Sequence, residues 1–315
     1  MTLLCKNKSV LIFVFLSFIY CIPNASAIAD IREDTITTNE ELNKTRLLMA
    51  GTTIAVGYST AIVLLDQAWY RNYPRSSFHF YNDNLDWLLM DKFGHATSSY
   101  YLSELSYKIL RWTGVDNMPA TIYSGLSAWA FISTIEALDG FSAEWGASGG
   151  DMIANTLGAS LFITQQAIWE EQRVKLKFSF SKSGLEKYRP DLLGSNFAEN
   201  VLKDYNGQTY WLSLNLNSFA GKNSGIPSWL NLAVGYGASG MLGSNINPPE
   251  YNSQSLPYYP RTRHWYISPD VDYSKIPTDS SFLISLFSLF DFVKMPAPTI
   301  EYSKEYGFAF HLLFF

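Results

Sequence analysis

The sequence predicts an α+β protein, in which an N-terminal four-helix membrane-type bundle is followed by a small antiparallel β-rich domain. Apolar residues recur at helical spacing up to about residue 172. From Val174 onward they alternate with polar residues, as in half-buried strands. The length of 315 residues allows two cores, so we expect a helical domain at 28–172 and a β-rich domain at 173–315.

Composition narrows the class of protein. Aromatic and charged residues each make up 16% of the chain, which is rich in aromatics and poor in charge for a globular protein. Such a chain buries much of its surface in protein or in lipid. The net charge is only −5 and no Lys/Arg run is present, so we exclude nucleic acid as a partner. We expect a membrane lipid or an envelope protein instead.

The first 27 residues have the pattern of an export signal peptide. Lys6 and Lys8 precede an apolar run over 10–20, and the Ala-Ser-Ala segment at 25–27 supplies the small residues needed for cleavage. The mature chain would then begin at Ile28, in the periplasm. We expect an exported, periplasm-facing and membrane-associated protein, with the outer membrane favoured over the inner.

Both cysteines lie inside this N-terminal segment. A lipoprotein alternative would use Cys21 as the modified residue, but Tyr20 stands where a small residue is preferred. On the cleavage interpretation Cys5 and Cys21 are both removed, so disulfides, cysteine nucleophiles and thiolate metal sites are not expected.

Four helices are predicted next, and the first carries no charge. Residues 47–65 are long enough to cross a bilayer core of about 30 Å, and equally suit a buried central helix. The other three are expected at 88–112, 120–138 and 152–172. Residues typical of helix ends support these positions. Pro119 and Gly140 flank the helix at 120–138, and Ser148 stands three residues before Asp151 in the spacing of a capping box.

Alternating sequence then predicts half-buried strands. The expected strands are 174–181, 210–217, 229–237, 264–273, 299–303 and 307–315, with a short helix at 281–293. The last strand resembles the C-terminal strand of outer-membrane barrels. Six strands are fewer than the eight of the smallest such barrel, so we expect a sheet packed on the helices and keep a barrel as the alternative.

Polar residues recur at helical spacing within the apolar helices. The pairs are Asp91 with His95, Glu136 with Asp139, and Asp151 with Asn155, and Lys92 lies beside the first pair. Residues three or four apart share one helix face, so helix ends with short connections would gather these groups around one pocket. Unpaired buried charges cost several kcal/mol, which favours a shared site.

Two chemistries suit this set, and a hydrogen-bonded network that only ties the helices together is a third interpretation. His95, Glu136, Asp139 and Asp151 are candidate ligands for a divalent metal: Mg, Mn or Ca, or Zn if His95 binds it. Alternatively, His95 is a general base oriented by a carboxylate. The candidate catalytic residues are His95, Asp91, Glu136, Asp139 and Asp151, and the candidate substrate-binding residues are Lys92, Ser142, Ser148 and Asn155.

Other nucleophiles and histidines receive structural interpretations. Serines 103, 142 and 148 lack a Gly-x-Ser-x-Gly context, so a serine hydrolase is not expected. His79, His264 and His311 have no partners at ligand spacing along the sequence, and we interpret each as structural.

At the polar residues the sequence resembles the uncharacterised YfiM-like family of predicted periplasmic lipoproteins. The motifs are Asp91-Lys92-x-x-His95, then Glu136-x-x-Asp139-Gly140-Phe141-Ser142 with Trp145-Gly146 and Ser148, and finally Asp151-x-x-x-Asn155-x-x-Gly158. The same order also resembles VanZ-like membrane proteins, which are linked to glycopeptide resistance. That second likeness implies membrane helices with inward-facing polar residues. The resemblance covers only the helical half.

The function expected is therefore a membrane-associated binding or assembly role in the bacterial envelope. The enzymatic alternative is a metal- or acid/base-dependent reaction on a phosphorylated lipid or a cell-wall precursor. A third hypothesis is an outer-membrane barrel component.

Overall fold

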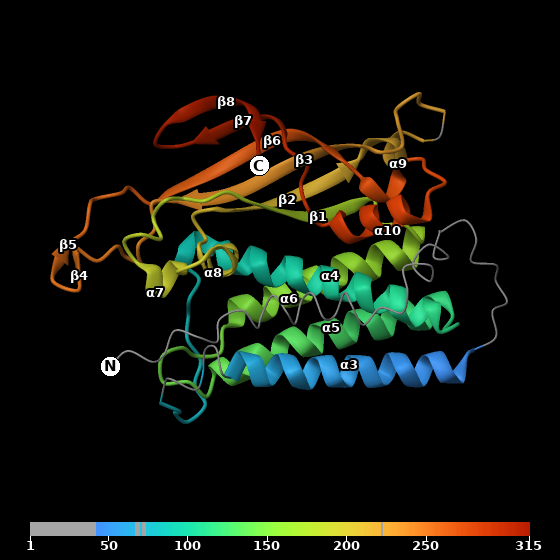
Figure 1. Ribbon diagram of the computed structural model, residues 1–315, viewed down its shortest axis with the longest axis horizontal. Helices are drawn as coiled ribbons and strands as arrows, with labels where there is room; N and C mark the ends of the chain where they lie inside the picture. The colour runs from blue at the N-terminus through green and yellow to red at the C-terminus, as the bar shows by residue number, and fades with distance from the viewer. Residues whose placement is uncertain (1–41, 67–69, 71–73, 222) are drawn as a thin grey trace. The chain divides into compact units, whose positions relative to one another are not determined.

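The computed structural model describes residues 42–66, 70, 74–221 and 223–315, so the predicted export signal lies outside the described residues (Figure 1). The described chain is α+β, with eight α-helices and a six-stranded antiparallel sheet. It divides into two compact units. The helical unit takes the described residues up to 82 together with 98–170, and the β unit takes 83–97 and 171–315.

Four helices occur where the sequence predicts them. They are α3 (Lys44–Leu65), α4 (Met90–Trp112), α5 (Asn117–Asp139) and α6 (Gly149–Trp169). Local chemistry sets their ends. Asn43 caps α3 by accepting from the Arg46 amide, and α6 ends at Glu170, whose left-handed φ of 53° stops the helix before the predicted residue 172.

Within the helical unit, α3 contacts α5 and α4 contacts α6. The Tyr58 hydroxyl of α3 lies 2.9 Å from Thr134 Oγ1 of α5. Between α4 and α6, Ser99 Oγ donates to the Asn155 carbonyl at 2.8 Å, and further along both helices Gln166 Nε2 donates to the Tyr107 hydroxyl at 3.0 Å. Residue numbers rise together along the two helices, so α4 and α6 run parallel.

The β unit is an antiparallel meander. Its strands are β1 (Val174–Phe180), β2 (Gln208–Asn215), β3 (Leu230–Ser239), β6 (Thr262–Val271), β7 (Ala297–Ser303) and β8 (Gly307–Phe314), paired in the order β1-β2-β3-β6-β7-β8. A separate hairpin pairs β4 (Glu250–Tyr251) with β5 (Gln254–Ser255). All six predicted strands are confirmed within a few residues.

Short helices connect these strands. They are α7 (Pro190–Leu193), α8 (Phe197–Lys203), α9 (Leu216–Ala220) and α10 (Ser281–Phe290), with the 3₁₀ turns η2 (Asp86–Leu89) and η3 (Tyr273–Lys275). The sequence predicts α10 but not α7, α8 or α9, which are each too short to show a periodic pattern.

The first strand alternates as predicted, and its polar side is the buried one. Lys175, Lys177 and Ser179 are 4%, 0% and 1% exposed, whereas Val174, Leu176 and Phe178 are half-buried. The buried lysines are paired with carboxylates. Lys177 Nζ lies 3.2 Å from Asp270, and Lys175 Nζ lies 2.8 Å from Asp272 and 2.6 Å from Asp291. Ion pairing thus makes burial of this polar face possible.

The opposite face of the sheet is apolar and largely exposed. One row of aligned residues crosses five strands, and its members are Leu212, Val234, Ile267, Ile300 and Phe310. Their exposed fractions run from 40% to 67%. This sheet therefore turns its apolar side outward along that row.

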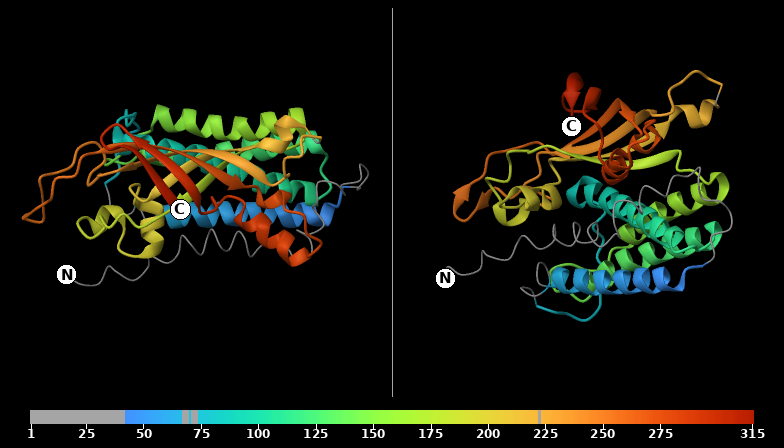
Figure 2. Two further views of the ribbon diagram at one scale, coloured as in Figure 1. Left: turned by 90° about the horizontal axis from the view of Figure 1, so that it is seen from above. Right: turned by 45° about the vertical axis from the view of Figure 1, so that its right-hand side comes forward.

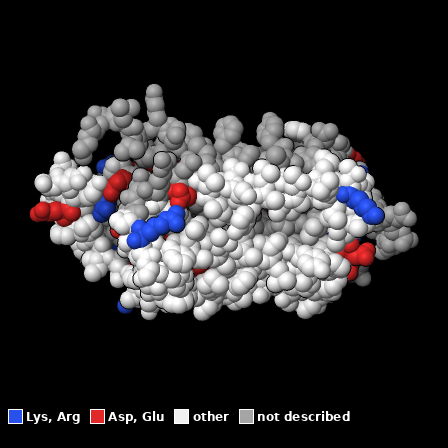
Figure 3. Space-filling view, turned by 90° about the horizontal axis from the view of Figure 1, so that it is seen from below, with Lys and Arg blue, Asp and Glu red and all other residues white. Residues whose placement is uncertain are grey.

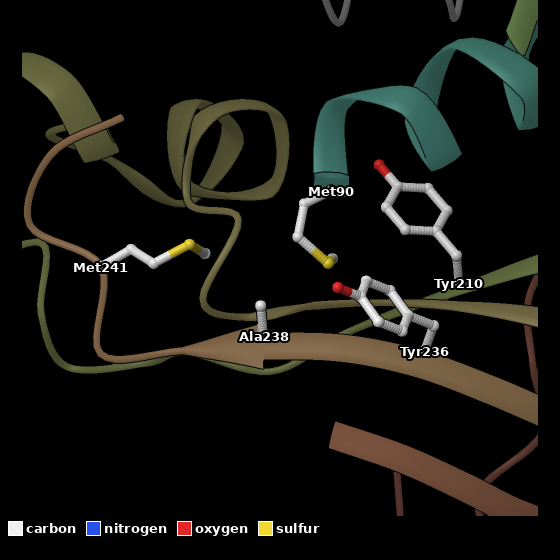
Figure 4. Packing of buried hydrophobic residues seen from close by; sticks show 5 residues of the cluster. All are labelled: Met90, Tyr210, Tyr236, Ala238 and Met241. Carbon is white, nitrogen blue, oxygen red and sulfur yellow. The ribbon is translucent and has the colours of Figure 1, made fainter. Parts of the chain in front are cut away.

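The first turns of α4 cover part of the apolar face. Met90 packs against Tyr210, Tyr236, Ala238 and Met241 in a buried cluster (Figure 4). One turn on, the Phe93 ring stacks on Tyr236 with 4.6 Å between ring centroids.

The sheet also curls around its polar side. Val293 forms a parallel bridge with Phe178 of β1, and the chain then continues from there into β7. The same short segment therefore touches β1 at one edge of the sheet and leads into a strand near the other edge. Lys294, which is fully buried, lies over the Trp211 ring at 5.0 Å.

Candidate functional site

The helical unit gathers several of the predicted site residues at the junction of α5 and α6. Glu136 lies in the last turn of α5 and is 3% exposed. Its Oε2 accepts a hydrogen bond from the Ser148 backbone amide at 3.0 Å. Gly140 ends α5 by donating its backbone N–H to the Glu136 carbonyl, so the chain turns within the next few residues toward α6.

Ser148 connects Glu136 to Asp151. It is the N-cap of α6, and its Oγ accepts from the Asp151 amide at 3.1 Å, as the predicted spacing requires. Ser148 is 2% and Asp151 5% exposed. Only the backbone amide of Asp151 takes part in this hydrogen bond, but one carboxylate oxygen of Asp151 lies within 4.8 Å of one of Glu136. Both buried carboxyl groups therefore lie near the start of a helix, where the backbone dipole favours negative charge.

Asn155 lies one turn further along α6 and is fully buried. Its backbone carbonyl accepts from Ser99 Oγ of α4, and Ser103 Oγ donates to the Ser99 carbonyl in turn. This contact fixes which part of α4 lies beside the first turns of α6.

Asp139 has a different neighbour. Its Oδ1 accepts from the Tyr70 hydroxyl at 2.7 Å, and the Tyr70 ring packs edge-on against Trp145. Burial raises the pKa of Tyr70, and the negative charges of Asp139 and Glu136 raise it further, so Tyr70 remains a hydrogen-bond donor. The contact of Tyr70 with Asp139 was not predictable, because nothing along the chain links the two residues.

Ser142 lines a small cavity beside this pair. The cavity has a volume of about 40 Å³, and its lining residues are Asp66, Tyr70, Pro74, Arg75, Leu138, Phe141 and Ser142. Ser142 Oγ accepts from the Glu144 amide at 3.3 Å. A volume this small holds one or two water molecules and not a lipid head group.

The remaining predicted residues lie in the β unit, within the first turns of α4. Lys92 Nζ pairs with Asp91 at 2.9 Å and with Asp83 at 2.7 Å, a partner that sequence reasoning missed. Burial and the charge of Asp91 raise the pKa of Tyr210. His95 is half-buried one helical turn after Asp91.

Two histidines that stand alone in the sequence share one partner in the structure. His264 and His311 are distant in sequence, yet both contact Glu301 in the β unit, at 2.6 Å each. Only the pairing of β6 with β7 and of β7 with β8 brings them together, so spacing along the chain gave no signal.

The comparisons with known proteins agree with the location of the helical motifs. Residues 79–166 match the model of a family described as predicted periplasmic lipoprotein (DUF2279). The match covers less than a third of the chain, and it includes all the predicted site residues from Asp91 to Asn155. No curated protein and no solved structure gave a match. The family description supports an exported protein associated with the cell envelope.

Proposed function

We propose that this chain is an envelope protein with a membrane-associated binding or assembly role, whose helices hold a buried divalent-cation site. The observation that carries the proposal is the closeness of Glu136 and Asp151 at the start of α6, where one carboxylate oxygen of each lies within 4.8 Å of the other and both residues are buried. Two buried carboxyl groups this close repel each other when both are ionised. A divalent cation with hard oxygen ligands offsets that repulsion.

His95 is the proposed third ligand, and the sequence motif supports it. His95 lies one helical turn after Asp91 in the Asp91-Lys92-x-x-His95 motif, and its side chain is half-buried. An imidazole nitrogen is a common metal ligand beside carboxylate oxygens.

The other predicted residues have supporting roles in this proposal. Lys92 neutralises Asp91 one turn before His95. Asn155 is a fully buried polar residue one turn beyond Asp151. Asp139 is the weaker ligand candidate because its carboxylate is already held by Tyr70.

Membrane association is supported by the exposed surface of the helical unit. In the described chain, α3 is the one helix long and apolar enough to cross a membrane. Large apolar side chains are exposed on three helices, namely Leu48, Met49, Val56 and Val63 of α3, Met118, Tyr123 and Leu126 of α5, and Ile153, Leu157 and Ile168 of α6. Figure 3 shows a largely uncharged face with charged groups mainly toward its ends. Such surfaces fit lipid better than water.

The likeness to YfiM-like and VanZ-like proteins belongs to the same proposal, in which the four helices form a membrane-type bundle with polar residues inward. The family description adds Cys21 as a lipid-modification site to be tested against cleavage after Ala27. Mass spectrometry of the mature N-terminus distinguishes these two forms.

Thermal unfolding with and without cations tests the site. The purified protein is stripped with EDTA, and its Tm is measured with Mg²⁺, Ca²⁺, Mn²⁺ or Zn²⁺. Saturation at about 100 times Kd adds about 2.7 kcal/mol, or roughly 5–10 °C in Tm. Asp151→Asn and His95→Gln should abolish the increase, and the matched control Asp139→Asn should keep most of it.

Two results would argue against this proposal. If no cation raises the Tm, or if Asp151→Asn responds like the wild type, the residues form a structural network only. If the cation-loaded protein releases phosphate from a phosphorylated lipid, and Asp151→Asn does not, the enzymatic alternative replaces the binding role.

A further inference from the structure

Four polar side chains form a continuous hydrogen-bonded chain across the β unit. Ser239 Oγ of β3 lies 2.7 Å from His264 Nε2 of β6, and His264 Nδ1 lies 2.6 Å from Glu301 Oε1 of β7. The second carboxylate oxygen, Oε2, lies 2.6 Å from His311 Nε2 of β8. Strand pairing places all four on the same face of the sheet.

The carboxylate determines where the protons lie. An ionised Glu301 only accepts hydrogen bonds, so His264 must donate from Nδ1. In the neutral imidazole Nε2 is then the acceptor, and the Ser239 hydroxyl donates to it. The same reasoning makes His311 a donor to Oε2. Hydrogen bonding to a carboxylate on one side therefore gives His264 the tautomer that a general base for Ser239 requires.

The position of Ser239 suits a nucleophile. Ser239 is the last residue of β3, and Gly240 follows it with a φ of 76°. A side chain at 240 is impossible because a Cβ there would lie 2.0 Å from the Pro260 carbonyl oxygen. The strand thus ends in a sharp turn directly after the serine, which is half-buried and so open to solvent, while the His264 side chain behind it is only 10% exposed.

Aromatic rings surround the base on the same face. The Tyr266 ring stacks on His264 with an angle of 16° between the ring planes, and it contacts Phe314 at 4.5 Å between centroids. Trp211 completes this buried aromatic cluster. The apolar surroundings strengthen the electrostatic contact of His264 with Glu301 and favour apolar substrates over charged ones.

We propose that Ser239, His264 and Glu301 form a second functional site that hydrolyses carboxylic esters with an apolar acyl group. Ser239 Oγ adds to the ester carbonyl carbon while its proton passes to His264 Nε2. The bond to the alcohol oxygen breaks, and the alcohol leaves with that proton. Water then adds to the acyl-serine, again losing a proton to His264, and the carboxylic acid departs as Ser239 regains its proton. Glu301 is the positioning residue for His264.

Covalent labelling of the full chain tests this inference directly. A fluorophosphonate probe should label the wild type, and Ser239→Ala should abolish labelling. His264→Gln should slow it by about 100-fold, the usual contribution of a general base. The matched control is Ser303→Ala, because Ser303 pairs with His264 in the sheet but its hydroxyl accepts from the Tyr306 amide. Hydrolysis of p-nitrophenyl butyrate should follow the same order.

A thiol variant tests the same site independently, in case Ser239→Ala fails to fold. In Ser239→Cys the His264 imidazole would favour the thiolate, so alkylation by iodoacetamide should extend to lower pH than in the double variant Ser239→Cys/His264→Gln. Mass spectrometry of the substituted peptide gives the rate at that position. Equal pH profiles for the two variants, or fluorophosphonate labelling that survives Ser239→Ala, would show that the chain of hydrogen bonds only holds the strands together.

Discussion

Glu136 Oε2 accepts the backbone amide of Ser148 at 3.0 Å, across a separation of twelve residues. This bond joins the last turn of α5 to the N-cap of α6. It therefore closes the loop at 137–147, which contains Gly140 and Gly146. The stability of this unit should depend on that single acceptor.

Substitution of Glu136 tests the contribution of this hydrogen bond to stability. Glu136→Ala removes the acceptor and leaves the Ser148 amide buried without its partner, so the free energy of unfolding should fall by about 1–3 kcal/mol. Glu136→Gln keeps an oxygen at the same place and should lose less. Denaturant titration in EDTA measures both variants. An equal loss for the two would show that charge, and not hydrogen bonding, stabilises this junction.

Stability of the β unit should rise with pH in the alkaline range. Burial lowers the pKa of Lys294 from 10.5 to about 8, although Asp270 at 3.8 Å opposes the shift. Between these values the unfolded chain binds more protons than the folded one, so the free energy of unfolding increases with pH, by at most roughly 3 kcal/mol from this group. Below pH 8 Lys294 is charged in the folded protein, and burial of that charge lowers the free energy of unfolding by its full amount.

The trend should reverse near pH 10. Burial raises the pKa of Tyr210 and Tyr266, so these tyrosines ionise first in the unfolded chain and favour unfolding. Urea unfolding at pH 7 to 11 measures the profile, and Lys294→Met is the matched control. The assignment to Lys294 fails if this variant shows the same rise between pH 8 and 10.

Close packing of β2 on β3 should make Gly235 intolerant of a side chain. A Cβ at this position would lie 2.7 Å from the ring of Trp211, which is 1% exposed. Gly235→Ala should therefore destabilise the protein by about 1–3 kcal/mol. At Gly51 in α3 a Cβ meets nothing within 4 Å, and Gly51→Ala should instead stabilise by about 0.5–1 kcal/mol. Thermal melts should separate the two variants in opposite directions.

Membrane association should depend on the exposed side of α3. Val56 is 60% exposed in the middle of α3, where residues 47–65 carry no charge. Val56→Lys places a charge there and should reduce recovery of the protein with vesicles of phosphatidylethanolamine and phosphatidylglycerol in a flotation gradient. Ser224→Lys, at an exposed position in the β unit, is the control for added charge. Unchanged flotation of Val56→Lys would exclude α3 as the lipid contact.

The helices were predictable because their signals are local. Apolar spacing located α3, α4, α5 and α6, and the spacing of Ser148 and Asp151 correctly gave the N-cap of α6. The backbone just before α4 was harder to predict. Trp87, Leu88 and Leu89 all have positive φ, and no local sequence pattern indicates this conformation for such bulky residues.

The buried face of the sheet and its long-range contacts could not be predicted from the sequence. Alternation located β1 correctly, but it establishes only that the two faces differ and not which face is buried. Lys175 and Lys177 lie inside because Asp270, Asp272 and Asp291 arrive from distant parts of the chain. The contacts of Glu301 with His264 and His311 likewise depend on the strand order.

The outward apolar row of the sheet affects how the protein should unfold. The side chains of Leu212, Val234 and Ile267 are already exposed in the folded state. The buried side of the sheet contains lysines and carboxylates. Unfolding in water therefore exposes less additional apolar surface, and more additional polar surface, than unfolding of a β-sandwich of the same size with an apolar core. Since hydrocarbon exposure raises the heat capacity and polar exposure lowers it, the β unit should unfold with an unusually small heat-capacity increment.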